Sequence, residues 1–370
     1  RLPDRKVQKI LRRKDIIGLL TMLSSYEDAR LSKEGINPER FGMYVGSGST
    51  QIGDLSSYYD LASECVDVEN RTFDSKLFGE GLRGVNPLVV LQTLMNNGLC
   101  YGAMTLDARG VNANFMDFQA AGLRAVGEAF HSIVENRADV IIAGGISGPV
   151  EPFQIREGVD SGYLARTKNS VNPPEEIVKP YDRERCGAIL SEGSVFVVLE
   201  EERHAVKRGA PVLGRVLGFG MANDGAINVF SEEKAPGLSR SLGKALDSAG
   251  IQRNSLGFVV GHGNGAPKAD GAEARAYYDV LSESVKALPL SSSKAVLGDM
   301  CEASGVAQVF CAIDAINSGT LAPTFNFSNG DQYSKQLCIS SSPQVIKRKV
   351  GVVTTRNFLG LSASLVVAEP

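Results

Sequence analysis

Gln119 stands at a junction that is typical of a catalytic site. In the stretch Ala113–Phe130 (ANFMDFQAAGLRAVGEAF), a short apolar run leads directly into a helix of small residues. A strand that feeds a buried helix is a common way to present a nucleophile, because the helix N-terminus lowers the pKa of a thiol placed there. A glutamine cannot act in this way, since its amide nitrogen lone pair is delocalised and the group only donates and accepts hydrogen bonds. From the residues alone, Gln119 is either a hydrogen-bonding group of a site or an ordinary polar side chain near a helix start.

Three further polar residues are candidates for the same site. His262 lies between two glycines at the end of an apolar run, in GHGNG, which leaves its imidazole accessible. Lys294 and Asp299 lie five positions apart in KAVLGD, at a second strand-to-helix junction. They are either part of a catalytic centre or a simple ion pair at a helix start.

Two cysteines are candidates for a relocated nucleophile. Cys301 follows Asp299 by two residues, and Cys186 lies in RERCGAILSEG. Either is a possible partner of His262 in nucleophilic catalysis, although free cysteines are more often small buried apolar residues. The six cysteines have no paired spacing and the chain has three histidines, so we expect neither a disulfide framework nor a metal site.

The elements that position these residues form an internal repeat. Gly35–Ser49 (GINPERFGMYVGSGS) and Gly250–Asn264 (GIQRNSLGFVVGHGN) align without a gap. Each follows an amphipathic helical stretch and gives a turn, a short apolar strand and a Gly-x-Gly ending. Gln119–Phe130 and Glu302–Ile313 match in the same way, in their small residues and apolar spacing.

The repeat predicts an α/β fold made of two related halves, residues 1–205 and 206–370. An apolar strand comes near the end of each half, at Ser194–Glu202 and Ser364–Pro370. Alternating strands and helices in both halves favour mixed sheets covered by helices. Paired strand-to-helix junctions would place the site between the halves.

Composition limits the class of protein. The 370 residues are 43% hydrophobic and 22% charged, as in a soluble globular protein, and the net charge of −3 gives no general support for nucleic-acid binding. No apolar run approaches the roughly 20 residues that span a bilayer, so we expect a cytoplasmic protein without membrane contact. The basic clusters Arg12–Lys14 and Lys347–Lys349 are either solvated faces or a surface for an acidic partner.

Taken together, these residues resemble the β-ketoacyl-acyl-carrier-protein synthases of the thiolase-like fold. The family block P-(F/Y)-D-x-x-R-x-G-x-x-x-x-E-G appears as PYDRERCGAILSEG, from Pro180 to Gly193. The block H-G-T-G-T-x-x-x-D-x-x-E appears as HGNGAPKADGAE from His262, and K-x-x-x-G-H appears as KAVLGD from Lys294. The blocks keep the family order over nearly the whole chain. The resemblance implies a five-layer αβαβα fold, and also that a first strand, preceding the N-terminal helix in the family, is missing from this sequence.

The departures from the family fall on the catalytic residues. In that register Gln119 replaces the nucleophilic Cys, Asp299 replaces the second His, and Asn264 and Ala266 replace two Thr. The gating loop reads TTRNFLGLSAS, with Phe358 at the gate. Condensation needs a thiolate to carry the acyl chain and two imidazoles to stabilise the enolate. The resemblance therefore implies a degenerate site that does not condense acyl units alone.

Two specialised members of the family carry Gln at this position. One is the chain-length factor of type II polyketide synthases, a silent subunit paired with an active synthase; the other is a malonyl-decarboxylating loading domain that keeps both histidines. The loss of the second His favours the chain-length factor. Decarboxylation of malonyl-carrier protein through Gln119, and acyl transfer by a relocated nucleophile such as Cys301, are the alternatives.

The resemblance also implies partners. The chain is expected to form a heterodimer with a Cys-containing β-ketoacyl synthase of polyketide, aryl polyene or fatty acyl synthesis. An acyl carrier protein would deliver the acyl chain on its phosphopantetheine, with no cofactor bound to this chain. The strand Val111–Met116 would lie at the dimer interface, where Phe115, Met116 and Phe118 either close the partner's acyl tunnel or simply pack in the core.

Overall fold

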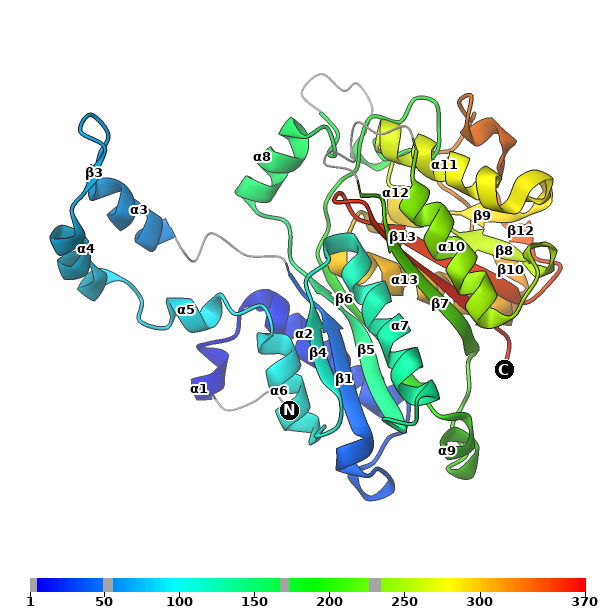
Figure 1. Ribbon diagram of the computed structural model, residues 1–370, viewed down its shortest axis with the longest axis horizontal. Coiled ribbons are helices and arrows are strands. Elements are labelled where there is room, and N and C mark those ends of the chain that lie inside the picture. Colours follow the sequence, from blue (N-terminus) through cyan, green and yellow to red (C-terminus); the bar gives the residue numbers. More distant parts are fainter. Residues whose placement is uncertain (1–4, 49–55, 167–172, 226–233) are drawn as a thin grey trace.

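The protein consists of two β-sheets with helices between them and on both outer faces (Figure 1). The computed structural model describes residues 5–48, 56–166, 173–225 and 234–370. From one side to the other, the layers are helix, sheet, helix, sheet and helix. The predicted five-layer α/β architecture is therefore confirmed.

The first sheet has the order β4-β1-β5-β6. Its strands are β1 (Phe41–Gly46), β4 (Asn112–Phe115), β5 (Val140–Ser147) and β6 (Gly193–Glu200). The first three run parallel, and β6 pairs antiparallel with β5. The parallel strands β1 and β5 are completely buried, as expected when helices cover both faces.

The second sheet has the order β11-β9-β8-β13-β14-β7. Its strands are β7 (Arg215–Asn223), β8 (Phe258–Val260), β9 (Pro289–Ser291), β11 (Cys338–Ile339), β13 (Val350–Arg356) and β14 (Leu361–Ala368). The strands β11, β9, β8 and β13 are parallel, and the β13–β14 and β14–β7 pairs are antiparallel.

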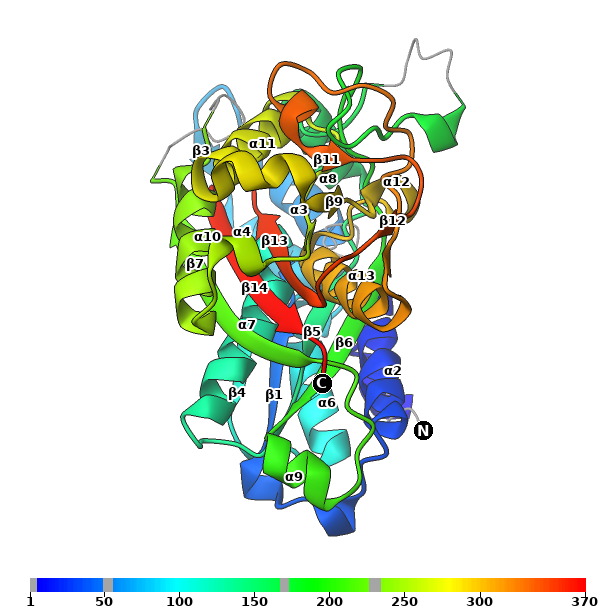
Figure 2. The same cartoon turned by 90° about the vertical axis from the view of Figure 1, so that its right-hand side faces the viewer.

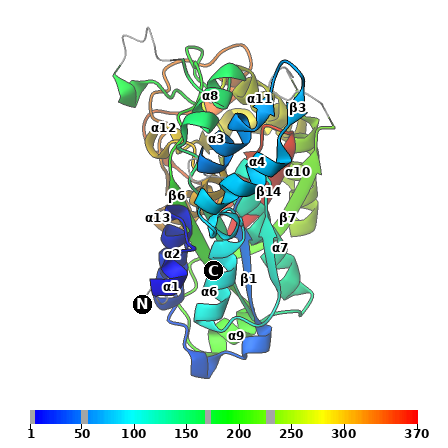
Figure 3. The same cartoon turned by 90° about the vertical axis from the view of Figure 1, so that its left-hand side faces the viewer.

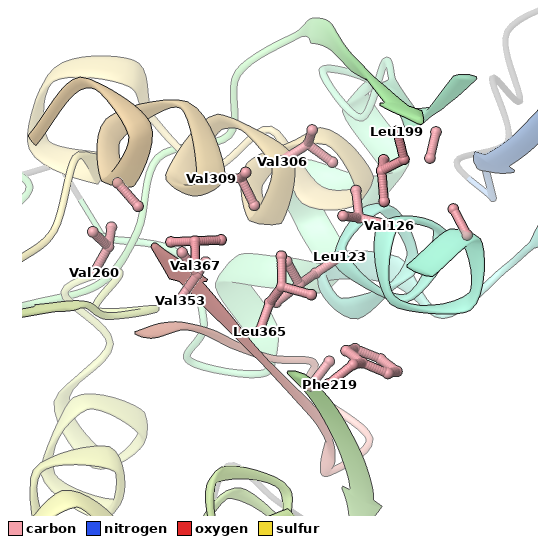
Figure 4. Close-up of a cluster of buried hydrophobic side chains, with 14 of the residues drawn as sticks. Leu123, Val126, Leu199, Phe219, Val260, Val306, Val309, Val353, Leu365 and Val367 are labelled. Atoms are coloured by element: carbon pink, nitrogen blue, oxygen red, sulfur yellow. The ribbon is translucent and has the colours of Figure 1, made fainter. Parts of the chain in front are cut away.

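Two helices form the central layer between the sheets: α7 (Ala121–Val134) and α13 (Ser304–Ser318). Figure 4 shows their side chains facing the second sheet, with Leu123, Val306 and Val309 close to Val353 and Leu365. One continuous apolar core therefore joins the two sheets through these helices.

The outer layers cover the remaining faces. α2 (Arg13–Asp28) and α6 (Asn97–Leu106) pack on the first sheet, and α10 (Pro236–Ala249) and α11 (Pro267–Leu281) cover the second (Figure 2). Shorter elements connect these: α1 (Arg5–Gln8), α8 (Pro152–Asp160), α9 (Glu202–Lys207), α12 (Lys294–Leu297), β10 (Thr320–Leu321) and β12 (Gln344–Val345). No helix in the described part of the chain has the length and apolarity to cross a membrane.

The internal repeat is visible in the backbone of the two junctions. Phe118 precedes Gln119 with φ 48°, and Cys301 precedes Glu302 with φ 41°. A left-handed backbone is strained for residues with side chains. Its occurrence at both equivalent positions shows that the two junctions share one turn geometry. We call the first of these turns, Phe118–Ala120, the elbow. Ser49, the last residue of the first repeat copy, lies outside the described residues.

A segment between β1 and α6 extends away from the layered body (Figure 1), and in Figure 3 it faces the viewer. It contains α3 (Ser56–Glu64), β2 (Val66–Asp67), β3 (Thr72–Phe73), α4 (Ser75–Gly81) and α5 (Val89–Gln92). We call residues 56–96 the arm. Many large apolar side chains on it are exposed, including Val68 at 80% and Val90 at 66%.

The basic cluster Arg12–Lys14 is a solvated face only at Arg13, whose side chain is 71% exposed. Arg12 and Lys14 are buried, and Lys14 Nζ donates a hydrogen bond to Ser47 Oγ at 3.3 Å. The pKa of Lys14 is lowered, because burial lowers it by more than the nearby carboxylates of Asp15 and Glu302 raise it. The prediction of a solvated charged face was wrong for Arg12 and Lys14, because both lie at the start of a helix that packs on the first sheet.

Candidate functional site

Gln119 lies at the end of the first sheet, between the two halves. It belongs to a 3-10 turn, Phe118–Ala120, that leads into α7, and its side chain is 2% exposed. Its backbone oxygen accepts a hydrogen bond from Thr355 Oγ1 at 2.8 Å, so β13 of the second sheet reaches the elbow directly. The side-chain nitrogen donates to Tyr163 Oη at 3.1 Å, and the buried side-chain oxygen has no partner among the described residues.

His262, Lys294 and Asp299, which the sequence analysis named as candidates for one site, lie together in the structure. Lys294 Nζ lies 3.0 Å from His262 Nδ1 and donates to Asp299 Oδ2 at 3.3 Å. All three side chains are buried, so the expectation of an accessible His262 imidazole was wrong. The other carboxylate oxygen of Asp299 accepts from the Cys301 backbone N–H and from Ser304 Oγ, each at 2.9 Å.

These contacts set the charge of each group. Burial alone raises the pKa of Asp299, but the Lys294 ammonium and the donors around the carboxylate outweigh it and lower that pKa to about 2. Burial, and then the Lys294 ammonium, lower the pKa of His262 well below its usual value. At neutral pH the site therefore holds an ionised carboxylate beside a neutral imidazole.

Two residues near His262 were not singled out by the sequence analysis. Thr355 Oγ1 lies 3.3 Å from His262 Nδ1, and Asn264 Nδ2 lies 3.3 Å from His262 Nε2. Asn264 was noted only as a replacement for a family Thr. Thr355 gave no signal, because a threonine on a buried strand is unremarkable until the second sheet places it against the first.

Tyr163 is a third residue that the sequence analysis missed. It follows α8, and its hydroxyl donates a hydrogen bond to Asp299 Oδ2 while accepting one from Gln119. Burial, and then the charge of Asp299, raise the pKa of Tyr163 well above its usual value, so it stays a neutral donor. Its side chain joins Gln119 to Asp299 across the boundary between the halves.

The space left in the site is small. A cavity of about 20 Å³ is lined by polar and aromatic side chains, namely Tyr163, His262, Asn264, Ala269, Glu273, Arg356, Asn357 and Phe358. This volume holds about one water molecule. At one wall the Arg356 guanidinium forms a buried ion pair with Asp224 at 2.6 Å.

The residues predicted to shape a tunnel occupy three different environments. The half-buried Phe115 ring packs edge-on against Tyr44, under the Arg124 guanidinium. Met116 is 59% exposed. The rings of Phe118 and Phe358 lie 4.4 Å apart, which places the predicted gate residue against the elbow.

The candidate relocated nucleophiles lie in different surroundings. Cys301 is buried, and burial followed by the charges of Asp299 and Glu302 raises the pKa of its thiol well above the usual value. A thiol held protonated is a poor nucleophile. Cys186 is exposed, and its sulfur contacts the Ile177 backbone oxygen at 3.8 Å.

The arrangement provides hydrogen bonding and fixed charge around an amide. The ionised Asp299 would repel negative charge that develops on an atom beside it. Gln119 offers a donor and an acceptor in a buried environment, without the capacity to form a covalent intermediate.

Comparison with known families identifies two matching regions. Residues 13–205 match the family model "Beta-ketoacyl synthase, N-terminal domain", and residues 213–328 match "Beta-ketoacyl synthase, C-terminal domain". Among curated proteins, the 3-oxoacyl-[acyl-carrier-protein] synthase 2 of Coxiella burnetii is 28% identical over 364 residues, covering 98% of this chain and 84% of that protein.

Solved structures share the fold. One is a type II polyketide synthase acyl carrier protein in complex with its ketosynthase (AntDE:AntF), which matches with a TM-score of 0.85 and 21% identity over 97% of this chain and 85% of that one. Another is the ishigamide ketosynthase/chain length factor, with a TM-score of 0.81 and 21% identity over 100% of this chain and 87% of that one. These matches confirm the predicted thiolase-like ketosynthase fold.

Proposed function

The chain belongs to the β-ketoacyl synthase family, and we propose that it is a non-catalytic, chain-length-factor-like subunit. Its partner would be a Cys-containing β-ketoacyl synthase, and the pair would form the synthase of a type II polyketide, an aryl polyene or a fatty acyl chain. Carrier-protein-bound acyl chains would be extended at the partner's cysteine, and this chain would limit the space available to them.

The observation that carries the proposal is the identity of the elbow residue. Gln119 occupies the strained strand-to-helix turn at the entry to α7, and no thioester forms on an amide. The position taken by a second histidine in the family holds Asp299, whose charge opposes enolate formation. The fold and the packing of the elbow are nevertheless intact.

Two surfaces support a partner subunit. The strand β4 is the edge of the first sheet and pairs only with β1 among the described residues, so its outer side is available for pairing with another strand. The arm carries a run of exposed apolar side chains: Tyr58, Tyr59, Val66, Val68, Phe73, Leu77, Leu82, Val90, Leu91 and Leu94. Exposed apolar surface of this extent is typical of an interface.

The nature of the partner follows from the fold. A second thiolase-like subunit has an equivalent edge strand, and the pairing of two such edges forms one continuous sheet. The half-buried Phe115 and exposed Met116 lie on and just after β4, where they would face the partner's acyl tunnel. An acyl carrier protein would then dock on the heterodimer, as a carrier protein does on the ketosynthase in the AntDE:AntF structure.

The test is native mass spectrometry of the full chain, alone and with the synthase encoded beside its gene. A one-to-one complex supports the proposal, provided that acyl groups label the partner and leave this chain unlabelled. A stable homodimer that ignores the synthase contradicts it.

The decarboxylase alternative is tested in the same samples. Release of carbon dioxide from malonyl-carrier protein that is lost in Gln119→Ala would favour decarboxylation. Because Asp299 is ionised beside His262, we expect no such release from this chain alone.

A further inference from the structure

Tyr163 occupies the space directly in front of the residue-119 side chain. Its hydroxyl is 3.1 Å from Gln119 Nε2 and also donates to Asp299 Oδ2. An acyl group attached to a side chain at position 119 would have to start from the atoms that now contact this phenol. An acyl group at position 119 and the Tyr163 side chain would therefore need the same volume.

The neighbouring space does not accommodate an acyl group either. The cavity beside Tyr163 and His262 is about 20 Å³, which is room for about one water molecule. Interiors packed this closely do not admit additional methylene groups without displacing side chains. The phenol must leave before a thioester can fit.

Tyr163 is also held firmly in place. Its backbone N–H donates to the Gly158 oxygen at 2.9 Å, and its backbone oxygen accepts from the Ala188 N–H at 3.0 Å. Its side chain packs in an apolar cluster with Leu164, Ala188 and Ala266. Moving the ring would break these contacts as well as its two hydrogen bonds.

We propose that Tyr163 is a plug that excludes an acyl-phosphopantetheine arm from this subunit, independently of the missing cysteine. The proposal rests on the proposed function in one respect: a subunit that shapes its partner's tunnel has no use for an acyl chain in its own. The proposal adds that the Tyr163 ring sterically excludes the acyl group, so a thiol introduced at position 119 would still be inaccessible to it. Each heterodimer would then hold one acyl chain, at the partner's site.

The experiment introduces a reporter thiol. Gln119→Cys and Gln119→Cys/Tyr163→Ala are treated with a pantetheine analogue that carries a chloroacetamide. The thiol proton passes to the buffer, the thiolate forms a C–S bond to the methylene carbon of the chloroacetamide, and chloride leaves from that carbon. Labelling at position 119 is followed with time by peptide mass spectrometry. Buried Cys65 and exposed Cys100 of the same chain are slow and fast internal references.

We expect Gln119→Cys to label as slowly as Cys65, and the double variant to label at least about tenfold faster, a difference of about 1.4 kcal/mol. Gln119→Cys/Tyr163→Phe is the matched control, because it keeps the ring and removes only the hydroxyl; it should stay slow. Free phenol added to the solution should bind in the space that the Tyr163→Ala change empties, and should therefore slow labelling of the double variant again. Equal rates for Gln119→Cys and the folded double variant would overturn the proposal.

Folding is checked by thermal unfolding of each variant. If the alanine variant does not fold, Tyr163→Leu, which keeps apolar packing but is shorter, takes its place with the same expected acceleration. Failure of the plug and failure of the proposed function are separable: the first appears in the labelling rates, and the second appears in the mass of the complex with the synthase.

Discussion

Lys294 and Asp299 form a fully buried ion pair, with Nζ and Oδ2 3.3 Å apart and side chains that are 2% and 0% exposed. Both lie in the loop and short helix after β9, and Asp299 is linked to Gln119 of the other half through the Tyr163 hydroxyl. Loss of either member would leave the other as a buried charge without its ionic partner, which is costly in free energy.

The first prediction concerns acid stability. The folded-state pKa of Asp299 is about 2, below the value of 3.8 that applies to an ordinary aspartate. Its stabilisation, roughly 2 kcal/mol, is therefore complete above about pH 4 and is lost as the pH falls towards 2. Asp299→Asn should cost about 3 kcal/mol at pH 7, and its difference from wild type in urea unfolding should shrink below pH 4. A difference that stays constant with pH would argue against an ionised Asp299.

The second prediction concerns His262. In the wild type, burial and Lys294 keep its pKa well below the usual value. In Lys294→Met the ammonium is gone, while Asp299 still raises the pKa of His262 and burial and Arg356 still lower it, so this pKa should rise. The chain has only three histidines, so their NMR signals are readily separated, and His204, which contacts Glu200, is the internal control. An unchanged His262 titration would contradict this account of its charge.

The third prediction concerns the contact between the halves at the elbow. A Cβ at Gly122 would overlap the backbone oxygen of Glu302, whereas Gly243 in α10 has open space. Gly122→Ala should lower the free energy of unfolding by about 3 kcal/mol through overpacking. Gly243→Ala should raise it by up to about 1 kcal/mol through helix propensity. Chemical denaturation of the two variants checks both signs.

The fourth prediction concerns the buried ion pair between Arg356 and Asp224. Arg356 and Asp224 are both buried, and Asp224 also accepts from the Gly237 backbone N–H at 2.6 Å. Asp224→Ala should cost about 3–5 kcal/mol, since it leaves a buried guanidinium unpaired. The exposed Asp247→Ala is the matched control and should change stability by less than about 0.5 kcal/mol. Similar Tm values for the two variants would refute the structural importance of this pair.

The fifth prediction concerns the partner surface. Met116 is 59% exposed just after the edge strand β4, and Val206 is 69% exposed on α9. Under the proposed function, Met116→Asp should abolish the heterodimer with the synthase without lowering Tm, while Val206→Asp should leave the complex intact. Analytical ultracentrifugation of the mixed subunits measures both. A complex that tolerates Met116→Asp would remove this strand from the interface.

Much of the candidate site was predictable because its residues lie at the ends of repeated strands. Gln119 and His262 were identified from small-residue and glycine spacing, and those patterns persist wherever a strand must run into a tightly packed helix. Tyr163 and Thr355 were missed, because an isolated tyrosine after a helix and a threonine in a strand carry no local signal of a site.

The repeat of two related halves, the resemblance to the β-ketoacyl synthase family and the glutamine at position 119 could be read from the sequence, since they depend on residue identity and on periodicity along the chain. Three features could be seen only in the folded chain: Tyr163 lies between Gln119 and Asp299, Lys14 is buried, and the arm exposes its apolar side chains. These features depend on which surfaces of distant segments meet. The burial and the charge of a side chain at such a contact depend on the packing of segments that are far apart in the sequence, and therefore cannot be read from the sequence around that residue.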